Sequence, residues 1–425
     1  MFYLIAASMG YGHLRAAWPL KKWAYKKNIL TINDYKQIPY SDLKIWKYTE
    51  SFYNFISRLR SFPFIGWISF SLFDRLFQYI PELKKTEKSK KPSLTLILNE
   101  KMILKKNFGK DLISRISEKP YPVVTTFFTA AFMAELHGYP QKIFCIATDS
   151  DLNRAWAPVY SEKSKIIYFT PTKRATERLL TYGVKKKNII FTGFPLPQEN
   201  INSLKYDLSY RLAGLDRDGS FIREQKILQK LGLKRLPLRK TPLSIMFATG
   251  GAGAQKEIGA DIIKSLAFDL KSGKIKLVIV AGVHLFLKEF FISCIRKNKL
   301  QDCLTTSIEI LYEKDKFSYF KRFNKTLKTT DILWTKPSEL SFYTALGLPI
   351  IIAPCIGYQE EYNKNWLLSI GSGICQKKPL KTKEWLFQLI ENKTFAKAAW
   401  LGYLNAPKDG TKKIVSIVKK FIKQQ

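Results

Sequence analysis

Short apolar runs alternate with glycine-rich turns and amphipathic stretches along the chain. The apolar runs cover residues 2–7, 123–128, 142–149 and 165–170 in the first half, and 243–248, 276–282, 331–337 and 349–354 in the second. Each run has the length and the β-branched content of a buried strand, and most precede a turn and a helical pattern. Strands that alternate with helices favour parallel sheets with crossover helices. The pattern therefore predicts two α/β halves, each a doubly wound sheet.

Helical periodicity separates the predicted strands. Helices are expected over residues 13–27, 172–182, 221–231, about 254–270 and 339–346, and from about residue 410 to the end. Residues 198–240 are polar and irregular, which interrupts the alternation. We therefore expect an N-terminal domain at 1–199, a linker with an insertion at 200–240, and a C-terminal domain at 241–425 that ends in a helix. In such sheets ligands bind at the carboxyl ends of the strands.

Composition excludes several classes of protein. The chain has 425 residues, of which 46% are hydrophobic and 25% charged, so it can bury real cores and is not a disordered polycation despite a net charge of +37. Its five cysteines are widely spaced and form no CxxC pair. This argues against a disulfide scaffold or a structural zinc site, and it fits a reducing compartment.

The surplus of positive charge suggests a phosphate-bearing partner. Residues 52–80 contain ten aromatic side chains interrupted by arginines, and five lysines follow in 84–91. An aromatic stretch beside a lysine cluster predicts a membrane-facing segment at 52–92, although core helices and a solvated surface give similar patterns. No 18-residue uncharged apolar run, signal peptide or nucleic-acid motif is found. We expect a peripheral, monotopic protein at the cytoplasmic face of an anionic membrane, with no nucleic-acid partner.

Two glycine turns are candidates for chemistry. The first, GYGH, runs from Gly10 to His13, and its glycines would let a ligand approach the backbone. His13 is a candidate general base, although a histidine in such a turn is often structural. The second turn, TGGAGA at 249–254, could hold a diphosphate through backbone amides. Neither turn has the GxGxxG or GK[ST] pattern, so no nicotinamide cofactor or triphosphate hydrolysis is expected.

Residues 334–373 resemble the donor-sugar region of GT-B glycosyltransferases of family 28, closest to the branch of monogalactosyldiacylglycerol synthases and processive diacylglycerol glucosyltransferases. The matching positions are Thr335, Lys336, Pro337, Ala345, Gly347, Pro349, Gln359, Glu360 and Asn363. The GYGH turn and residues 146–196 also look like this branch. Two positions depart from the pattern. Ser338 and Glu339 replace paired glycines, and Thr344 replaces an acidic residue that binds the nucleotide ribose.

The resemblance implies a GT-B fold, with two Rossmann-like domains that face each other across a cleft. It implies an inverting transfer of a sugar from a nucleotide-sugar, a UDP-hexose, to a membrane lipid such as diacylglycerol. Catalysis would fall to His13 and Asp149, with Asp149 or Asp151 orienting the imidazole or an aspartate itself serving as base. The acceptor would meet Gly10, Gly12 and Trp156. The donor would meet Gly250, Gly251, Ala252, His284, Lys336, Pro337, Ser338, Glu339, Leu340, Thr344, Gln359 and Glu360.

The family needs no metal, so neither a metal nor another cofactor is expected. Asp149 and Asp151 are interpreted as the match to a Thr-Asp (TD) sequence of the family rather than as metal ligands. Two other functions stay open. One is a GT-B protein that has lost transfer activity and binds a lipid or a protein partner, for which Thr344 and Glu339 give the motive. The other is a sugar-nucleotide epimerase, which would not need the aromatic and basic segment. Binding of a nucleotide-sugar discriminates the first alternative from an enzyme.

Overall fold

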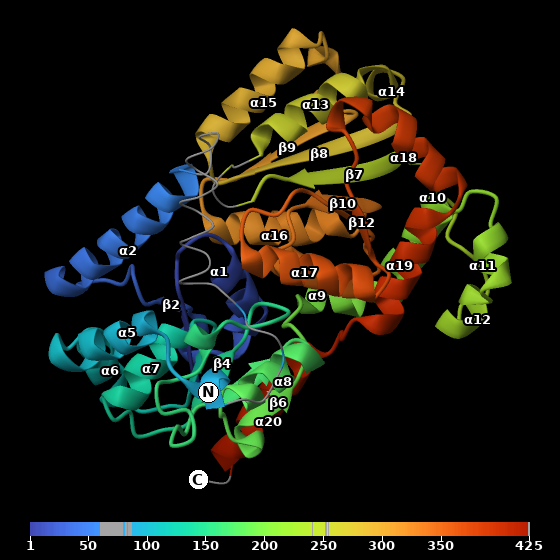
Figure 1. Ribbon diagram of the computed structural model, residues 1–425. Coiled ribbons are helices and arrows are strands. Elements are labelled where there is room, and N and C mark those ends of the chain that lie inside the picture. The colour runs from blue at the N-terminus through green and yellow to red at the C-terminus, as the bar shows by residue number, and fades with distance from the viewer. Residues whose placement is uncertain are drawn as a thin grey trace. The chain divides into compact units, whose positions relative to one another are not determined.

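The computed structural model describes residues 1–59, 80, 83, 87–239, 241–250, 253 and 255–423 (Figure 1). The chain forms two units, each built on a six-stranded parallel sheet. The first consists of Met1–Leu196, Ile356–Asn363 and Asp409–Gln425, and the second of Pro197–Cys355 and Lys364–Lys408. Parallel sheets flanked by helices confirm the predicted fold class of two Rossmann-like α/β halves.

The sheet of the N-terminal unit has the order β2-β1-β3-β4-β5-β6. Its strands are β1 (Tyr3–Ala6), β2 (Leu30–Thr31), β3 (Val123–Thr125), β4 (Ile143–Ile146), β5 (Ile167–Thr170) and β6 (Ile189–Phe191). Its helices are α1 (Gly12–Ala17), α2 (Tyr40–Leu59), α4 (Glu87–Lys90), α5 (Leu94–Lys105), α6 (Lys110–Ser117), α7 (Phe128–Leu136), α8 (Lys173–Thr181) and α20 (Gly410–Lys423). Ile5, Thr125 and Cys145 lie side by side in the register of β1, β3 and β4, so these three strands end at one edge.

The sheet of the C-terminal unit has the order β12-β11-β10-β7-β8-β9. Its strands are β7 (Leu243–Ala248), β8 (Ile275–Gly282), β9 (Ile308–Tyr312), β10 (Ile332–Thr335), β11 (Ile350–Ile352) and β12 (Gly373–Cys375). Its helices are α9 (Gln198–Asn202), α10 (Leu204–Leu215), α11 (Ser220–Glu224), α12 (Ile227–Leu231), α13 (Lys256–Ser265), α14 (Ala267–Lys271), α15 (Leu285–Lys297), α16 (Lys316–Leu327), α18 (Thr382–Glu391) and α19 (Thr394–Asn405). Helices α13 and α15 lie together over β7–β9 (Figure 1). Helix α17 (Tyr358–Ser369) begins in the N-terminal unit and ends in the C-terminal unit.

Residues 200–240, expected as a linker, are instead part of the C-terminal unit. They form α10–α12, and Leu208, Leu212 and Leu215 are buried in the core of that unit. Burial of such side chains stabilises a fold by about 1.5–3 kcal/mol each. Arg211 on α10 is also buried, and it donates hydrogen bonds to the backbone carbonyls of Leu327, Thr330, Leu346 and Gly347. Part of the polarity of this segment, that of Arg211, therefore serves contacts inside the fold.

The C-terminal helix was expected in the second domain, but α20 packs on the N-terminal unit. Phe421 lies with its ring 5.5 Å from that of Phe144 on β4, and the Thr411 hydroxyl donates to the Leu196 carbonyl at 2.6 Å. Gly410 approaches the backbone of Phe194 so closely that an added Cβ would lie 2.2 Å from the carbonyl oxygen. The apolar face predicted for this helix therefore covers the first sheet.

Two predicted helices are broken. The pattern over residues 13–27 yields α1 and then the 3₁₀ helix Trp18–Trp23, because Pro19 has no N–H to continue the α-helical bonds. The pattern over 221–231 yields α11 and α12, separated by Lys226 at φ +51°. The 3₁₀ helix Glu339–Leu346 spans the residues predicted as a helix.

Membrane spans were not expected, and among the helices that the structure describes none is both long and apolar enough to cross a bilayer. The predicted membrane-facing segment 52–92 falls largely outside the described residues. Its described parts include the end of α2, α4 and Lys91. The buried guanidinium of Arg154 donates from Nε and Nη2 to the carbonyl of Lys90, at 3.3 and 2.9 Å, which fixes the end of the segment on the N-terminal unit.

Candidate functional site

The glycine turn after β1 brings His13 to the carboxyl edge of the first sheet. Gly10 adopts φ +74°, a conformation that glycine reaches without steric cost, and α1 begins two residues later at Gly12. His13 is half-buried on the first turn of this helix. The sequence pattern thus placed the imidazole correctly at the end of a buried strand.

A backbone carbonyl fixes the tautomer of His13. The Nδ1 atom lies 2.6 Å from the carbonyl oxygen of Thr126, which directly follows β3, and the Thr126 hydroxyl donates back to the His13 carbonyl at 3.0 Å. Because a carbonyl only accepts, Nδ1 is the protonated nitrogen, and Nε2 of the neutral ring is the basic one. The ring of Phe127 packs edge-on against the imidazole at 4.9 Å. These contacts hold the imidazole in one orientation at the edge of the sheet.

Sequence reasoning missed Thr126 and expected a carboxylate to orient the imidazole. The signal was present, because VVTTFF was predicted as the strand beside the glycine turn. What the pattern could not give was the order of strands, since β3 follows β1 by over 110 residues and still pairs with it. The orienting group is a main-chain carbonyl, which every residue type carries, so no side-chain motif marks it.

The turn after β4 carries the predicted aspartates at the same edge. Asp149 is half-buried and Ser150 is buried. The Ser150 N–H donates to Oδ1 of Asn363 on α17 at 2.9 Å, and Nδ2 of Asn363 lies 3.4 Å from Oδ1 of Asp149. On the other side, the Thr172 hydroxyl donates to the Ser150 carbonyl at 2.6 Å. The turn is therefore held from two elements, and Asp149 lies on it beside β4.

Asp151 has a structural role, which corrects its candidacy as an orienting group or base. Its carboxylate is 1% exposed and accepts hydrogen bonds from Nε and Nη2 of Arg178, at 2.8 and 2.9 Å, from Nε of Arg174 at 2.6 Å and from the Leu152 N–H. Burial opposes the charge of Arg178, but its bonds to Asp151 outweigh this and raise the pKa of the guanidinium. These four donors tie the carboxylate to α8 and to the next residue of the turn.

Trp156 also belongs to the core, which corrects its assignment to the acceptor. The side chain is 2% exposed and its ring packs 5.1 Å from that of Phe128 on α7. The neighbouring Arg154 donates to the carbonyls of Ala157 and Pro158, and burial lowers the pKa of Arg154 to about 10. The Trp156 side chain therefore packs in the core and has almost no surface of its own to offer a ligand.

In the C-terminal unit the second glycine turn lies beside the TKP motif, which is formed by residues 335–337. Gly250 follows β7 at φ +79°, and a Cβ there would lie 2.9 Å from Cε of Lys336. The lysine side chain therefore lies across the bare backbone of the glycine turn. Gly251 and Ala252 lie outside the described residues. The adjacent strands β7 and β10 thus bring together two motifs that are over 80 residues apart.

The residues that follow Lys336 lead into the 3₁₀ helix Glu339–Leu346. Pro337 and Leu340 are buried, whereas Ser338 and Glu339 are partly exposed at the start of the helix. Ser338 precedes the helix without a side-chain capping bond. Of these four residues, Ser338 and Glu339 are therefore the two whose side chains are exposed enough to contact a ligand.

Thr344 does not occupy a binding position, which is a further correction. It is fully buried and its hydroxyl bonds that of Ser372. Gly402 of α19 is packed against it, since a Cβ there would lie 2.3 Å from the Thr344 hydroxyl. Thr344→Glu would bury a carboxylate in this contact, at a cost of several kcal/mol. It would not restore a ribose clamp.

The remaining donor candidates lie on two different units. His284 precedes α15 in the C-terminal unit, half-buried, with its ring 5.5 Å from that of Phe286. Gln359 and Glu360 are partly exposed on the first turn of α17, in the part assigned to the N-terminal unit. Glu360 accepts from the Ile356 N–H through Oε2 at 2.6 Å, so one carboxylate oxygen stabilises the start of the helix.

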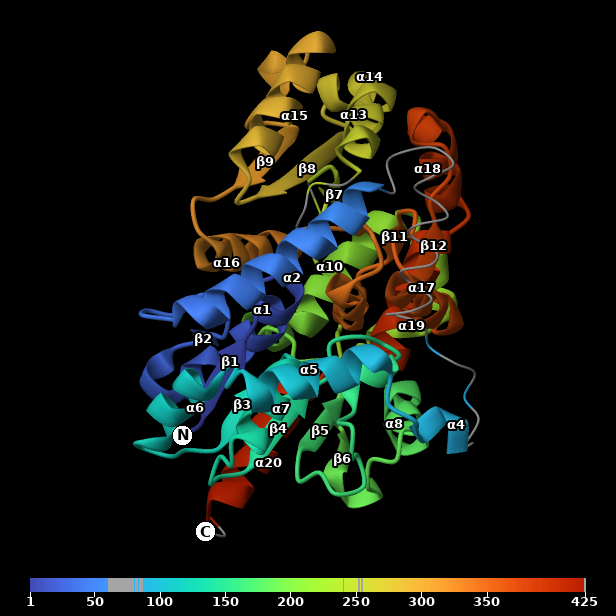
Figure 2. The same cartoon turned by 60° about the vertical axis from the view of Figure 1, so that its left-hand side comes forward.

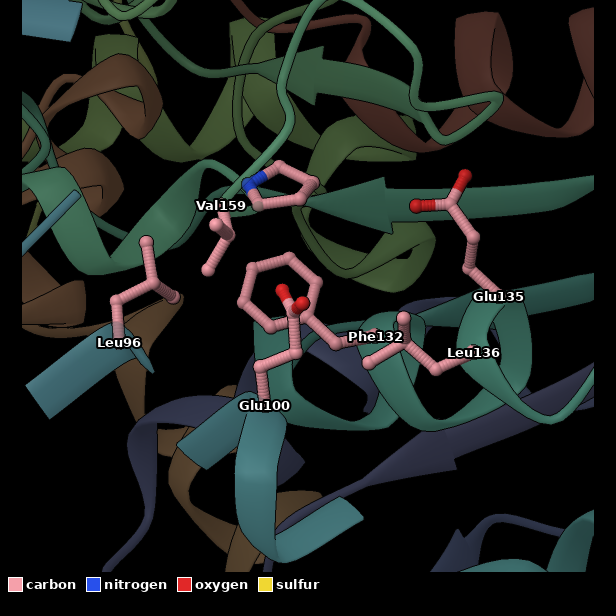
Figure 3. A pocket seen from close by; sticks show the side chains of 7 residues that line it. Leu96, Glu100, Phe132, Glu135, Leu136 and Val159 are labelled. Carbon is pink, nitrogen blue, oxygen red and sulfur yellow. The ribbon is translucent and has the colours of Figure 1, made fainter. Parts of the chain in front are cut away.

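Figure 3 shows a pocket of the N-terminal unit away from these residues. It is lined by Leu96, Glu100, Phe132, Glu135, Leu136, Pro158 and Val159. Burial raises the pKa of Glu100, and the charge of Glu135 raises it further. Glu135 itself accepts from the Ser164 hydroxyl and the Lys165 N–H. No residue predicted for the site lines this pocket.

Within the described ranges, no group of three or more histidine, cysteine or acidic side chains is placed so that it could hold a metal ion. None of the five cysteines forms a disulfide. Burial raises the pKa of the Cys145 thiol inside β4 and makes it unreactive.

The curated proteins that are similar to this chain all have the same name. A family model described as a domain of unknown function (DUF6938) matches residues 231–305. A processive diacylglycerol beta-glucosyltransferase from Bacillus cytotoxicus is 23% identical over 292 residues. Two further curated relatives of this chain are also processive diacylglycerol beta-glucosyltransferases. This confirms the resemblance drawn from the motifs. The match covers 67% of this chain and spans less than two thirds, 64%, of the B. cytotoxicus protein.

Solved structures with similar folds have low sequence identity. MurG from Acinetobacter baumannii is 11% identical, with a TM-score of 0.49 and coverage of 99% of both chains. A UDP-GlcNAc 2-epimerase from Neisseria meningitidis, bound to UDP-GlcNAc, is 15% identical, with a TM-score of 0.43 over 73% of this chain and 80% of that one.

Proposed function

We propose that the chain is an inverting glycosyltransferase that moves a hexose from a UDP-sugar to a hydroxyl of a membrane lipid such as diacylglycerol. The observation that carries the proposal is the geometry of His13. The bond from Nδ1 to the Thr126 carbonyl leaves Nε2 as the basic nitrogen, at the ligand-binding edge of a parallel sheet. The relatives named processive diacylglycerol beta-glucosyltransferases support the choice of donor and acceptor class.

The reaction needs a base and a stabilised leaving group. Nε2 of His13 takes the proton of the acceptor hydroxyl while the oxygen of that hydroxyl bonds to the anomeric carbon of the sugar. The bond from that carbon to the diphosphate breaks, and the nucleoside diphosphate leaves with the electron pair. The imidazolium then carries the proton until it passes to solvent. Asp149, on the turn after β4, is the rival base in this scheme.

The donor is assigned to the second glycine turn and the TKP region. Amides around Gly250, Gly251 and Ala252 would hold the diphosphate, and the ammonium of Lys336, whose side chain lies across Gly250, would neutralise its charge. His284 and the start of the 3₁₀ helix at Ser338 are further phosphate candidates. Glu339 takes the place proposed for Thr344 as the group for the ribose hydroxyls. Gln359 and Glu360 are assigned to the sugar hydroxyls, and no metal is assigned.

The acceptor lipid requires a membrane surface, and we assign this contact to the segment 52–92. The support is its charge and aromatic content, together with the Arg154 bonds that fix the carbonyl of Lys90. A peripheral attachment at the cytoplasmic face of an anionic membrane completes the proposal.

The direct test uses vesicles of phosphatidylglycerol with diacylglycerol and radiolabelled UDP-glucose or UDP-galactose. A labelled glycolipid, absent when diacylglycerol is omitted, is the expected product. Conversion of UDP-GlcNAc to its C2 epimer without glycolipid would favour the epimerase. Absence of any thermal shift with UDP-, GDP- or dTDP-sugars would favour a protein that has lost transfer activity.

The contact between Gly250 and Lys336 gives a prediction for the donor half. Gly250→Ala should weaken UDP-sugar binding about tenfold, because the new methyl group both meets the lysine chain and puts alanine at positive φ, which costs about 1–2 kcal/mol. Calorimetric titration with UDP measures the effect. Gly273→Ala is a matched control, since Gly273 also has positive φ but no atom within 4 Å of its Cβ position. Equal losses of UDP affinity in both variants would contradict the prediction.

A further inference from the structure

We infer that Gln255 is a positioning residue, which holds the second glycine turn beside the TKP motif for the donor diphosphate. The inference rests on the proposed function, because it concerns the donor half of the same reaction. Gln255 follows the turn directly and is the N-cap residue of α13. The glycine motif ends at residue 254, so it does not include this glutamine.

Three neighbouring strands end at one level on this side of the second sheet. Ala248 of β7, Thr335 of β10 and Ile352 of β11 lie side by side in the register of the sheet. The middle strand, β10, continues into the TKP motif, and the glycine turn follows β7. Neighbouring strands are about 4.8 Å apart, so the ends of β7 and β11 are about 10 Å apart. A group that joins the turn to β11 must therefore reach past the end of β10.

The side chain of Gln255 makes this connection. Its Nε2 donates to the carbonyl oxygen of Pro354 at 2.6 Å. Because a carbonyl only accepts, the amino group of the amide must be the one that faces Pro354. The preceding residue, Ala353, donates from its N–H to the Thr335 carbonyl at 2.9 Å, so the acceptor lies where β11 leaves β10. One side chain therefore ties the turn after β7 to the strand on the far side of the TKP motif.

The backbone of Gln255 has a conformation that glutamine rarely adopts. Its φ is +77°, in the left-handed region, where a side chain raises the energy of the chain. Such a conformation persists only where the surrounding contacts fix it, and residues of this kind cluster at ligand-binding sites. The bond to Pro354 is such a contact. Glycine would adopt this backbone more easily, but it carries no amide to bond Pro354.

The described residues of the turn are also fixed from other sides. The Gly253 N–H donates to the Gly250 carbonyl at 3.3 Å. A Cβ on Gly253 would lie 3.0 Å from Cδ2 of Leu287, so α15 packs directly on this backbone. Gln255 adds the contact toward β11. A turn that is fixed on two sides loses less conformational freedom when a diphosphate binds, and this favours affinity.

The variant Gln255→Met tests the bond, because methionine keeps the length of the side chain but has no N–H to donate. Loss of one such hydrogen bond should weaken UDP binding about fivefold in calorimetric titration. The diphosphate is held in the ground state and the transition state alike. The KM for the UDP-sugar should therefore rise by the same factor, while kcat stays within about twofold of wild type.

Gln37→Met is the matched control. Gln37 is also a glutamine at positive φ, +64°, but it lies in the N-terminal unit, and its Oε1 accepts from Nη1 of Arg115 at 3.4 Å. The same substitution there should leave UDP affinity at the wild-type value. Equal UDP affinities in Gln255→Met and Gln37→Met would overturn the inference.

Gln255→Gly separates a role in binding from a role in shaping the backbone. Glycine also lacks the amide but adopts positive φ without steric cost, so the thermal midpoint of this variant should lie above that of Gln255→Met. Its UDP affinity should nevertheless be as low as that of Gln255→Met. A UDP affinity that rises with the thermal midpoint from one variant to the other would reduce Gln255 to a structural residue.

A measurement without UDP keeps this test apart from the test of the proposed function. If Gly250→Ala weakens UDP binding and Gln255→Met does not, the donor site stands and the role of Gln255 fails. If the wild type binds no UDP, the proposed donor site fails. Hydrogen exchange of residues 248–260 then still decides the contact, because exchange should be faster in Gln255→Met than in Gln37→Met. Equal exchange in the two variants would overturn the inference.

Discussion

Replacing His13 by alanine is expected to lower transfer about 10²–10⁴-fold while UDP-sugar binding stays close to that of the wild type. The imidazole is held at this edge of the sheet by the 2.6 Å contact of Nδ1 with the Thr126 carbonyl. Its removal takes away the base but none of the donor candidates. Steady-state transfer to diacylglycerol vesicles, with UDP affinity measured in parallel, shows both parts of the prediction.

The N-terminal unit offers a matched control in His137. This histidine is also half-buried and also bonded to a backbone carbonyl, that of Phe108 at 3.0 Å, but it lies at the end of α7. His137→Ala should keep transfer within a few-fold of wild type. If His13→Ala behaves like this control, the base is Asp149, and Asp149→Asn should then show the large loss.

Both sheets could be predicted from the sequence because most of their strands are apolar runs that turns and helical stretches separate. Residues 243–248, for example, are all buried in β7 and were predicted from the pattern alone. Shorter strands were missed. Strand β2 has two residues, Leu30 and Thr31, both only partly buried, so no periodicity could mark it.

The site was only partly predictable, for a physical reason. Motifs report which residue types occur at a turn, and in this way they indicate His13, Asp149 and Lys336 as candidates. They do not report which side of an element a residue faces. Thr344 and Trp156 were assigned to ligand binding by their place in the family pattern, yet contacts with Gly402 and Phe128 bury them. Those contacts come from distant parts of the chain.

The two aspartates of the turn after β4 also differ in the partners that distant parts of the sequence provide. Asp149 and Asp151 are two residues apart and chemically alike, so the sequence offered both for the same role. Helix α8 begins more than 20 residues later and supplies two arginines to Asp151. Asp149 instead faces the neutral amide of Asn363. The different partners, not the motif, give one aspartate a structural role and leave the other as a candidate for chemistry.

Replacing Asp151 by alanine should therefore destabilise the N-terminal unit by about 3–5 kcal/mol. The side chains of Asp151 and Arg178 are both fully buried, so the variant leaves a guanidinium inside the fold without its counter-charge. The Leu152 N–H loses its acceptor as well. Urea unfolding, with hydrogen exchange of the β4 and β5 amides to localise the change, measures the loss.

The same helix supplies the control, because Glu177 of α8 is an exposed carboxylate next to Arg178. Glu177→Ala removes the same charge and should change the unfolding free energy by no more than about 0.5 kcal/mol. In the double variant Asp151→Ala, Arg178→Met no buried charge is left unpaired, so part of the stability should return. If Asp151→Ala is as stable as Glu177→Ala, the ion pair does not hold the turn. Asp151 would then again be a candidate for the chemistry at this edge.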